Sequence, residues 1–348
     1  MENPIQSWPP DGQLDPAEVI GLLPPALPEI DSLTNLLDKM PTEPPQIILG
    51  VLHKGCKLIL GGTSKSNKSW SLLDMAVSVA GGIPWWGHET TRGHVLYINF
   101  ELADWAIVRR LKTIITDPKG RQDAQGRQLS QFLDVWNLRG HAADISLLRP
   151  TIEEKLSAKQ YSLIILDPAY KMLGDRDENA NGEIGSMMNE LERLCRATGA
   201  AIAIAHHFAK GNSADKSPID RMSGAGAWAR DPDAIIVLTP HETDGAFTAS
   251  FILRNLPPKD EIVLRWQFPL MLKDETLDPD AIKRPQSANK KMTDSDFILT
   301  YLSPTPTAAK DILKATASAM SDRTCWNYLK RLTASGLISS TSTGYARK

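Results

Sequence analysis

The stretch GGTSKSNKSW, residues 61–70, constrains the fold of this chain more strongly than any other part of the sequence. It has the spacing of a phosphate-binding loop, G-x-x-x-x-G-K-[ST], with Gly62 at its start and Lys68 and Ser69 at its end. One position departs from the pattern, because Asn67 replaces the second glycine. Asparagine is among the few non-glycine residues that adopt positive φ readily, so we expect the loop to form.

The flanking segments have the order that such a loop requires. An apolar strand is predicted at Cys56–Leu60, and a helix at Ser69–Ala80 that ends at the following glycines. Backbone N–H groups at the start of a helix bind phosphate oxygens, and the helix dipole favours their negative charge. The residues expected to bind the phosphates of ATP are Gly62, Thr63, Ser64, Lys65, Ser66, Asn67, Lys68, Ser69 and Trp70.

Two residues of this loop have more specific expected roles. Lys68 would reach the β and γ phosphates and take part in catalysis, and Ser69 would hold Mg²⁺. The alternative interpretation of the whole stretch is a solvated turn that is rich in serine and lysine.

The segment from Gly50 to about Leu272 alternates predicted strands with helices, which indicates a doubly wound α/β domain with a mostly parallel sheet. One helix has an apolar face within Ile184–Leu194 and ends at Gly199. Ligands of such domains bind at the carboxyl ends of the strands. Besides Cys56–Leu60, the predicted strands are His94–Asn99, Leu163–Leu166, Ala200–Ala205, Ala234–Leu238 and Thr248–Arg254.

Two carboxylates follow strands of this predicted sheet. In LIILDP, an apolar strand is followed by Asp167, which could bind Mg²⁺ through water beside the phosphate-binding loop. In HVLYINFEL, Glu101 comes just after a strand, where a carboxylate can orient and deprotonate an attacking water. Their alternative roles are a cap at a strand-to-loop turn for Asp167 and a surface residue at a helix start for Glu101.

The stretch AIAIAHHFAKG ends an apolar strand in two histidines, His206 and His207. We expect only one of them to be functional, in contact with the γ phosphate, and the other to be a core histidine. The polar loop that follows, residues 209–223, contains Lys210, Lys216 and Arg221. It could bind a nucleic-acid backbone, or it could be a plain surface loop.

The C-terminal part has a different composition. Helices are predicted near Ser295–Leu302, Thr307–Ala315 and Ser321–Ala334, and short strands at Leu337–Ser340 and Gly344–Arg347. This order suggests a winged helix. The candidate DNA-binding residues lie near one face of its third helix, with Trp326, Leu329 and Leu332 on another; a protein-docking winged helix is the alternative. The candidates are Arg323, Asn327, Lys330 and Arg331.

Composition and charge support this division. The chain has 348 residues and a net charge of −2, but residues 291–348 carry eight basic and four acidic residues, which leaves −6 for the remainder. We predict a Pro-rich arm or linker at residues 1–45, an ATPase domain at 46–272, a linker at 273–290 and the winged-helix domain at 291–348. The N-terminus has no signal-peptide pattern, no apolar run has the length of a membrane span, and the three cysteines are scattered, so we expect a cytoplasmic protein.

Residues 45–272 resemble the RepA-type hexameric replicative helicases, which belong to the RecA/DnaB superfamily of AAA-like ATPases of plasmids, phages and mobile elements. The stretches GGTSKSNKSW, VLYINFEL, LIILDPAYK, IAHHFAKG and RMSGAGAWARDP carry the resemblance. It implies a RecA-like core in a ring with ATP at the subunit interfaces, and the roles given above for Lys68, Ser69, Glu101, Asp167 and His207. It also implies an arginine that acts on the neighbouring subunit's site, for which Arg254 is the first candidate and Arg230 the second.

Three features depart from this family. Asn67 replaces glycine, Pro168 follows the aspartate where a polar residue is common, and the C-terminal domain is not part of the minimal helicase. The expected function is an ATP- and Mg²⁺-dependent motor that translocates on single-stranded DNA, with a primase or another replication protein as a further partner. The alternatives are a DNA-binding regulator or a nucleotide-dependent scaffold without unwinding activity.

Overall fold

The computed structural model describes residues 29–39, 42–124, 128–207, 226–283, 292–317 and 320–348. Residues 1–44 and 45–348 form separate units. In the first unit, helix α2 (Leu33–Lys39) follows Ser32, whose side-chain oxygen accepts a hydrogen bond from the Asn35 N–H at 3.2 Å. None of the residues of this helix is buried. Among the described helices, none is both long and apolar enough to span a membrane.

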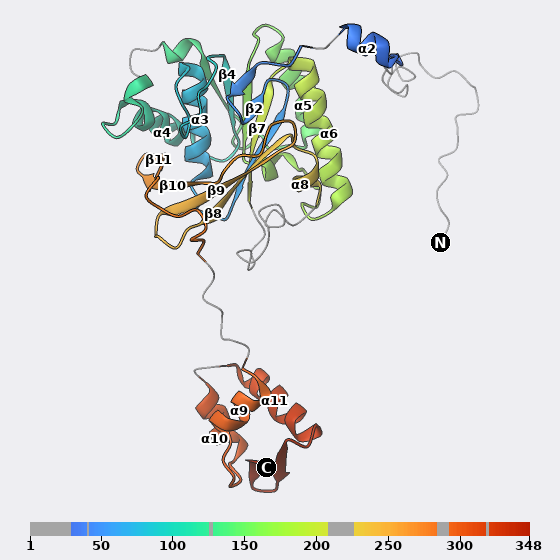
Figure 1. The fold of residues 1–348 in the computed structure, drawn as a ribbon, viewed down its shortest axis with the longest axis vertical. Coiled ribbons are helices and arrows are strands. Elements are labelled where there is room, and N and C mark those ends of the chain that lie inside the picture. Colours follow the sequence, from blue (N-terminus) through green and yellow to red (C-terminus); the bar gives the residue numbers. More distant parts are fainter. Residues whose placement is uncertain (1–28, 40–41, 125–127, 208–225, 284–291, 318–319) are drawn as a thin grey trace, which may run out of the picture. The chain divides into compact units, whose positions relative to one another are not determined.

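Within the described residues, nine strands form one sheet in the order β11-β10-β9-β8-β3-β7-β6-β4-β5 (Figure 1). Strands β3 to β8 are mutually parallel, and β9, β10 and β11 extend the sheet in antiparallel pairs. The α/β fold class predicted from the sequence is therefore confirmed. The strands are β3 (Lys57–Gly62), β4 (Val95–Asn99), β5 (Leu133–Asn137), β6 (Leu163–Asp167), β7 (Ala201–His207), β8 (Ala234–Pro240), β9 (Ala246–Leu253), β10 (Ile262–Gln267) and β11 (Leu270–Lys273).

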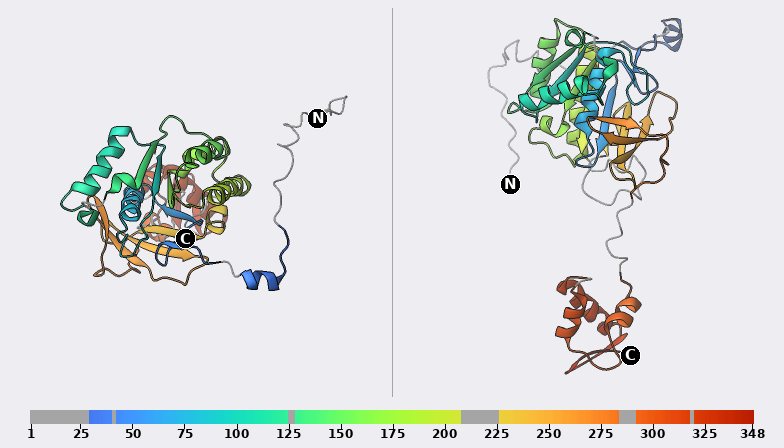
Figure 2. Two further views of the ribbon diagram at one scale, coloured as in Figure 1. Left: turned by 90° about the horizontal axis from the view of Figure 1, so that it is seen from above. Right: turned by 90° about the vertical axis from the view of Figure 1, so that its left-hand side faces the viewer.

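Helices cover both faces of this sheet (Figure 2). Helices α3 (Lys68–Gly81) and α4 (Asp104–Thr116) pack against one face, and α5 (Ile145–Leu156), α6 (Asn181–Thr198) and α8 (Ala227–Arg230) against the other. Successive strand residues alternate between the two cores, because side chains of a strand point to opposite faces. Each of the parallel strands β3, β4, β6, β7 and β8 supplies apolar side chains to both cores.

Glycine ends the two longest of the described helices, as the sequence predicts. Gly82 follows α3 with φ of 62°, and its N–H and that of Ile83 bond to carbonyl oxygens of the last turn. Gly199 follows α6 with φ of 65°, and its N–H bonds to the Cys195 carbonyl at 2.7 Å. These left-handed conformations are readily available to glycine and turn the chain back toward the sheet.

The remaining short elements of this domain lie around the sheet. A small antiparallel pair, β1 (Gln46–Ile48) and β2 (Leu52–His53), precedes β3. Residues 274–283, which were predicted to belong to a linker, are hydrogen-bonded to the sheet. The Thr248 hydroxyl donates to the Pro279 carbonyl, and the Lys283 N–H donates to the Pro240 carbonyl. The 3₁₀ turns are η1 (Gln122–Ala124), η2 (Leu129–Gln131) and η3 (Ala169–Met172).

The C-terminal module has its own small core. Helices α9 (Asp294–Tyr301), α10 (Ala309–Thr316) and α11 (Asp322–Ala334) are followed by the hairpin of β12 (Ile338–Thr341) and β13 (Gly344–Arg347). Phe297, Ile312 and Leu329 are among its fully buried residues. Each expected element is present within two residues of its predicted position. Thr307 also forms a bridge with Tyr345 of the hairpin.

Candidate nucleotide-binding site

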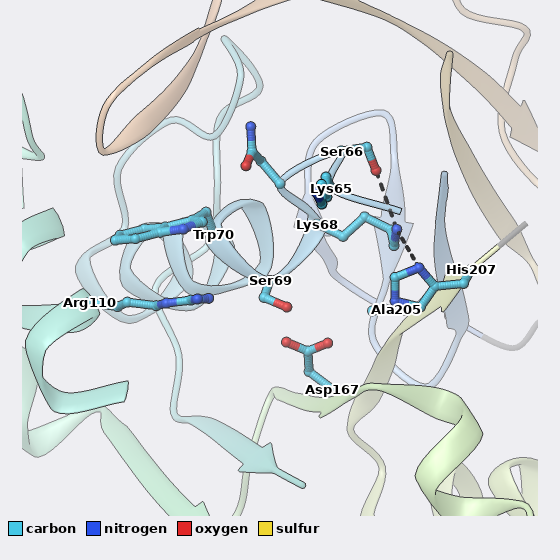
Figure 3. Close-up of a pocket in the computed structure, with 10 residues that line it drawn as sticks. Lys65, Ser66, Lys68, Ser69, Trp70, Arg110, Asp167, Ala205 and His207 are labelled. Carbon is cyan, nitrogen blue, oxygen red and sulfur yellow. Dashed lines mark hydrogen bonds between the residues drawn. The ribbon is translucent and has the colours of Figure 1, made fainter. Parts of the chain in front are cut away.

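A pocket of about 240 Å³ lies where β3, β6 and β7 end and α3 begins. Figure 3 shows Lys68 and His207 at one side, Ser69 and Asp167 in the middle, and Trp70 and Arg110 at the other side. This is the edge of the sheet at which a parallel α/β fold binds its ligands. The described residues that line the pocket are Lys65, Ser66, Asn67, Lys68, Ser69, Trp70, Arg110, Asp167, Ala205 and His207.

The loop before α3 has the backbone of a phosphate-binding loop. Asn67 adopts φ of 57° and Lys65 φ of 64°, both in the left-handed region. Asn67 thus occupies the conformation for which glycine is usual, which explains how the loop forms without that glycine. Gly62 favours glycine for a different reason, since a Cβ there would lie 2.7 Å from the Ser66 hydroxyl oxygen, which would have to shift.

The ammonium group of Lys68 is buried within this loop. Its Nζ donates to the carbonyl oxygens of Gly62 at 2.9 Å and Thr63 at 2.8 Å, and lies 3.2 Å from His207 Nδ1. Burial lowers the pKa of Lys68 to about 8, and the nearby Asp167 carboxylate opposes this effect. A phosphate group in the pocket would supply the negative charge that this buried cation lacks.

Asp167 is the last residue of β6 and faces the same side of the sheet as α3. It is only 5% exposed, and the Tyr97 hydroxyl donates to its Oδ2 at 2.6 Å. Burial raises the pKa of its carboxyl, whereas hydrogen bonds from Tyr97 and Ser69 act in the opposite direction. Ser69 and Asp167 point toward each other in Figure 3, and hydroxyl and carboxylate oxygens are the donor types that Mg²⁺ prefers. These two residues therefore fit a magnesium site.

The two histidines at the end of β7 point to opposite faces of the sheet. His207 pairs with Gly62 of β3 and lines the pocket beside Lys68. His206 is 8% exposed and stacks on Trp228 of α8 with ring centroids 3.9 Å apart. His206 is absent from the described residues that line the pocket and lies in the core, so its predicted nucleotide-binding role remains a prediction that this position does not favour. The expectation that one histidine lies in the core fits this geometry.

Glu101 lies in the bend between β4 and α4 and is exposed. Its N–H donates to the Asn99 side-chain oxygen at 3.2 Å, which fixes the start of this bend. Burial raises the pKa of Tyr170, and the charges of Glu101 and Asp167 raise it further, which puts both carboxylates in electrostatic range of one ring. Glu101 is outside the described lining of the pocket.

Arg230 and Arg254 are the two candidates for the arginine that acts on a neighbouring subunit's site. They lie together at the end of the sheet opposite the pocket. The Arg254 guanidinium donates to the Arg230 carbonyl, and the Arg254 N–H donates to the Asp233 carbonyl at 2.9 Å. Asp233 directly precedes β8, so both arginines lie near the beginning of this parallel strand, whereas the pocket lies at the strand ends. Both side chains are exposed.

Two residues near the pocket were given no specific role by the sequence patterns. Arg110 is on α4, and its guanidinium carbon lies 4.9 Å from the ring centroid of Trp70. Tyr97 lies one strand away from Asp167 and holds its carboxylate. Strand alternation in VLYINFEL could have indicated Tyr97, but no pattern indicates Arg110, because its place depends on how α4 packs.

On the C-terminal module, Arg331 and Trp326 of α11 have surroundings that the sequence pattern did not indicate. Arg331 is bonded to Asp294, and its guanidinium lies 4.7 Å from the centroid of the Tyr328 ring, so it is engaged within the module. Trp326 is 45% exposed and does not join the buried Leu329 and Leu332. A groove of about 490 Å³ is lined by Trp326, Asn327, Lys330, Thr333, Ala334, Ser340 and Tyr345.

Four predicted nucleic-acid-binding residues remain to be placed. Lys210, Lys216 and Arg221 lie outside the described residues. Arg323 is exposed at the first turn of α11.

Comparisons with known proteins bear on the fold and the family. The family model described as "AAA domain" matches residues 24–213, which is more than half of the chain. A solved ATPase domain matches with a TM-score of 0.50 and 11% identity, over 76% of this chain and 100% of that domain. A KaiC-like protein from the hyperthermophilic archaeon Pyrococcus horikoshii OT3 matches with a TM-score of 0.46 and 10% identity, over 66% of this chain and 93% of that protein. The search of curated proteins found no match.

The match to the solved ATPase domain shows a shared fold, and the loop, strand order and pocket have the arrangement expected of that fold. The chain belongs to the AAA-domain family, and its core is a RecA-like P-loop ATPase domain.

Proposed function

We propose that the chain is an ATP-hydrolysing motor, a RepA-type replicative DNA helicase that works as a ring. The observation that carries this proposal is the pocket in which Lys68, Ser69, Asp167 and His207 meet at the start of α3. An ammonium, a hydroxyl and a buried carboxylate are the groups that P-loop NTPases place around a transferred phosphoryl group and its metal ion, and His207 adds an imidazole beside the ammonium.

Each of these groups has a distinct proposed role. Lys68 binds the β and γ phosphates, and the loop N–H groups around Asn67 bind the phosphate oxygens. Ser69 and Asp167 would hold Mg²⁺, which supplies charge neutralisation at the phosphates when bound. His207, whose Nδ1 lies 3.2 Å from Lys68 Nζ, contacts the γ phosphate and loses this contact when the γ phosphate is released.

Glu101 is proposed as the general base. It lies after β4 at the carboxyl edge of the sheet and has an exposed side chain, which leaves it free to reach a water at the pocket mouth. Catalytic carboxylates often come into contact with their target only in the complex with substrate, so its place outside the pocket lining is compatible with this role.

Arg254 is proposed to act on the site of a neighbouring copy, with Arg230 as the second candidate. Its position near the beginning of β8, opposite the strand ends, keeps it away from the pocket of its own chain. Such a residue contributes to catalysis only if a second copy brings its pocket to it. This argument supports a ring, for which the resemblance to RepA-type helicases suggests six copies.

Translocation on single-stranded DNA, a mobile-element origin and a cytoplasmic location are parts of the same proposal. We propose the C-terminal module as a winged helix that binds DNA or a replication partner such as a primase. The order of three helices and a hairpin supports the winged-helix assignment, as does the bridge between Thr307 and Tyr345. Arg323, Asn327, Lys330 and Arg331 are its candidate contacts, and Arg331 would have to exchange its exposed ion pair with Asp294 for a phosphate.

A mixing experiment tests the motor directly. Wild-type protein is mixed with increasing fractions of Arg254→Ala, and ATP turnover and strand separation of a forked DNA are measured on each mixture. Each Arg254→Ala copy disables the one site that its arginine would complete, so independent sites would lose turnover in proportion to the variant fraction. In a motor whose sites fire in a coupled sequence, one disabled site stalls the ring, and turnover should fall more steeply than the wild-type fraction. Arg265→Ala is the control, since Arg265 is a half-buried arginine on β10 whose partner is Asp274 in the same chain.

The outcomes separate the proposal from its alternative. A linear fall of turnover would contradict coupled sites in a motor, and turnover that does not fall at all would contradict the role of Arg254. Turnover without strand separation on any forked substrate would contradict the helicase and favour a DNA-binding regulator whose ATPase site controls assembly.

A further inference from the structure

The groove on the C-terminal module is built from one helix and the hairpin that follows it. Trp326, Asn327 and Lys330 contribute to its lining from α11, and Ser340 and Tyr345 contribute from β12 and β13. Trp326 and Lys330 are four positions apart and therefore share one face of the helix. The groove is thus bordered by an aromatic residue of the helix and by another of the hairpin.

The core of the module does not use the Trp326 side chain. Trp326 is 45% exposed, whereas Leu329 on the same helix is fully buried. The aromatic pairs that the structure describes in this module join Phe297 to Tyr301 and to Tyr328, so among the described residues no ring stacks on Trp326. An exposed indole leaves a large apolar face in water, and a flat ligand that covered this face would gain hydrophobic and stacking free energy.

The polar groups of the groove favour a ligand with negative charge and hydrogen-bonding edges. Of the described residues that line it, Lys330 carries the only charge, and its ammonium is exposed. The side chains of Asn327 and Ser340 are exposed as well, and neither bonds to another described residue. Residues 291–348 carry eight basic and four acidic residues, so the whole module attracts a polyanion.

We propose that this groove binds single-stranded DNA, with one unpaired base stacked on Trp326 and Lys330 on a neighbouring phosphate. The inference rests on the proposed DNA-binding role of the module and names the form of DNA that it binds. In a duplex the faces of each base are covered by the adjacent base pairs, and only the base edges are open in the grooves. An aromatic face therefore selects unpaired bases, and it does so with little preference for sequence.

Equilibrium binding of three DNA ligands to the full chain tests the inference. The ligands are a single strand, an abasic strand of the same length that keeps the phosphates, and the duplex of the first strand. Fluorescence anisotropy without nucleotide should show that Trp326→Ala weakens single-strand binding by about 5- to 150-fold and leaves the other two ligands unchanged. Trp326→Phe keeps an aromatic face and should retain most of the single-strand affinity.

Two further variants separate stacking from charge and from folding. Lys330→Ala should weaken the single strand and the abasic strand alike and lower the salt dependence of log affinity by about 0.7, whereas Trp326→Ala should keep the wild-type salt dependence. Trp105→Ala makes the same change at a tryptophan that is 69% exposed on α4, outside the groove, and should bind all three ligands as wild type does. Trp326 is outside the core of the module, so its removal leaves the fold intact.

The contradicting results are distinct. Equal losses of the single strand and the abasic strand in Trp326→Ala would overturn the stacking of a base. Unchanged single-strand affinity in Trp326→Ala would overturn the inference, leave the proposed function standing and favour a protein partner for the groove. Wild-type protein that binds none of the three ligands would overturn the proposed DNA motor, and this inference would fall with it.

Discussion

The hydrogen bond from Tyr97 to Asp167 offers the sharpest test of the metal site. The Tyr97 hydroxyl donates to Asp167 Oδ2 at 2.6 Å, and both residues are buried on neighbouring strands. Burial and the adjacent carboxylate raise the pKa of Tyr97 well above its ordinary value, so it remains a donor across the working pH range. Tyr97→Phe removes the donor and keeps the ring, and thus leaves a buried carboxylate with one partner fewer.

The size of the effect follows from that geometry. A hydrogen bond to a charged group contributes about 1.5–3 kcal/mol, and one pKa unit corresponds to about 1.36 kcal/mol. Burial already raises the pKa of Asp167, and its bond from Tyr97 opposes this rise. Tyr97→Phe should therefore raise that pKa further, because it removes an interaction that favours the charged form. Because Mg²⁺ binds the deprotonated carboxylate, its affinity should fall by roughly 10- to 100-fold.

The assay is ATP turnover as a function of Mg²⁺ concentration at several pH values. In Tyr97→Phe the acid limb of the pH profile should move to higher pH, and excess Mg²⁺ should restore much of the turnover. Tyr161→Phe is the control. The Tyr161 hydroxyl also donates to a carboxylate, that of Asp134, at 2.7 Å, but Asp134 is on the edge strand β5. Tyr161→Phe should therefore leave the Mg²⁺ requirement unchanged. An unchanged Mg²⁺ requirement and pH profile in Tyr97→Phe would refute the reasoning.

Three further predictions concern the loop and its neighbours. Because burial lowers the pKa of Lys68 to about 8, the free protein loses this cation as pH rises through 8. Above that pH, ATP affinity should fall by up to about tenfold per pH unit. Calorimetry from pH 6.5 to 9.5 that shows no such fall would contradict this prediction. Asn67, with φ of 57°, should tolerate glycine, whereas Asn67→Val should cost about 1–2 kcal/mol or more in thermal unfolding and weaken ATP binding. His207→Ala should lower ATP turnover with little change in stability. His206→Ala removes the stack on Trp228 and should lower the free energy of unfolding in denaturant by about 1–3 kcal/mol. Equal effects of the two variants on turnover and on stability would contradict the placement of His207 in the pocket and His206 in the core.

Much of the fold could be predicted because local patterns and sheet packing agree. The apolar run Leu163–Leu166 indicated a strand buried on both faces, and β6 is one. Strand β5 was missed because it lies at the sheet edge, where Asp134 and Asn137 interrupt its apolar pattern. The hairpin of β10 and β11 was missed as well, since Phe268-Pro269 in its turn carries none of the usual glycine or asparagine signals.

The site was predictable only where a residue follows directly from a strand or a loop. Neighbouring histidines on a strand must face opposite sides, but the choice of His207 depends on its pairing with Gly62, which the sequence does not reveal. Trp326 was placed with the apolar face of α11, but Cys325 fills that buried position. Arg110 and Phe268 reach Trp70 through tertiary packing, for which no short motif exists.

The central claim is that the pocket at the start of α3 hydrolyses ATP in the service of a DNA motor. Steady-state ATP hydrolysis, measured with and without single-stranded DNA on wild type and Lys68→Ala, tests it most directly. The account predicts turnover that single-stranded DNA stimulates and that Lys68→Ala abolishes. Wild-type protein that binds ATP but shows negligible turnover with and without DNA would contradict it.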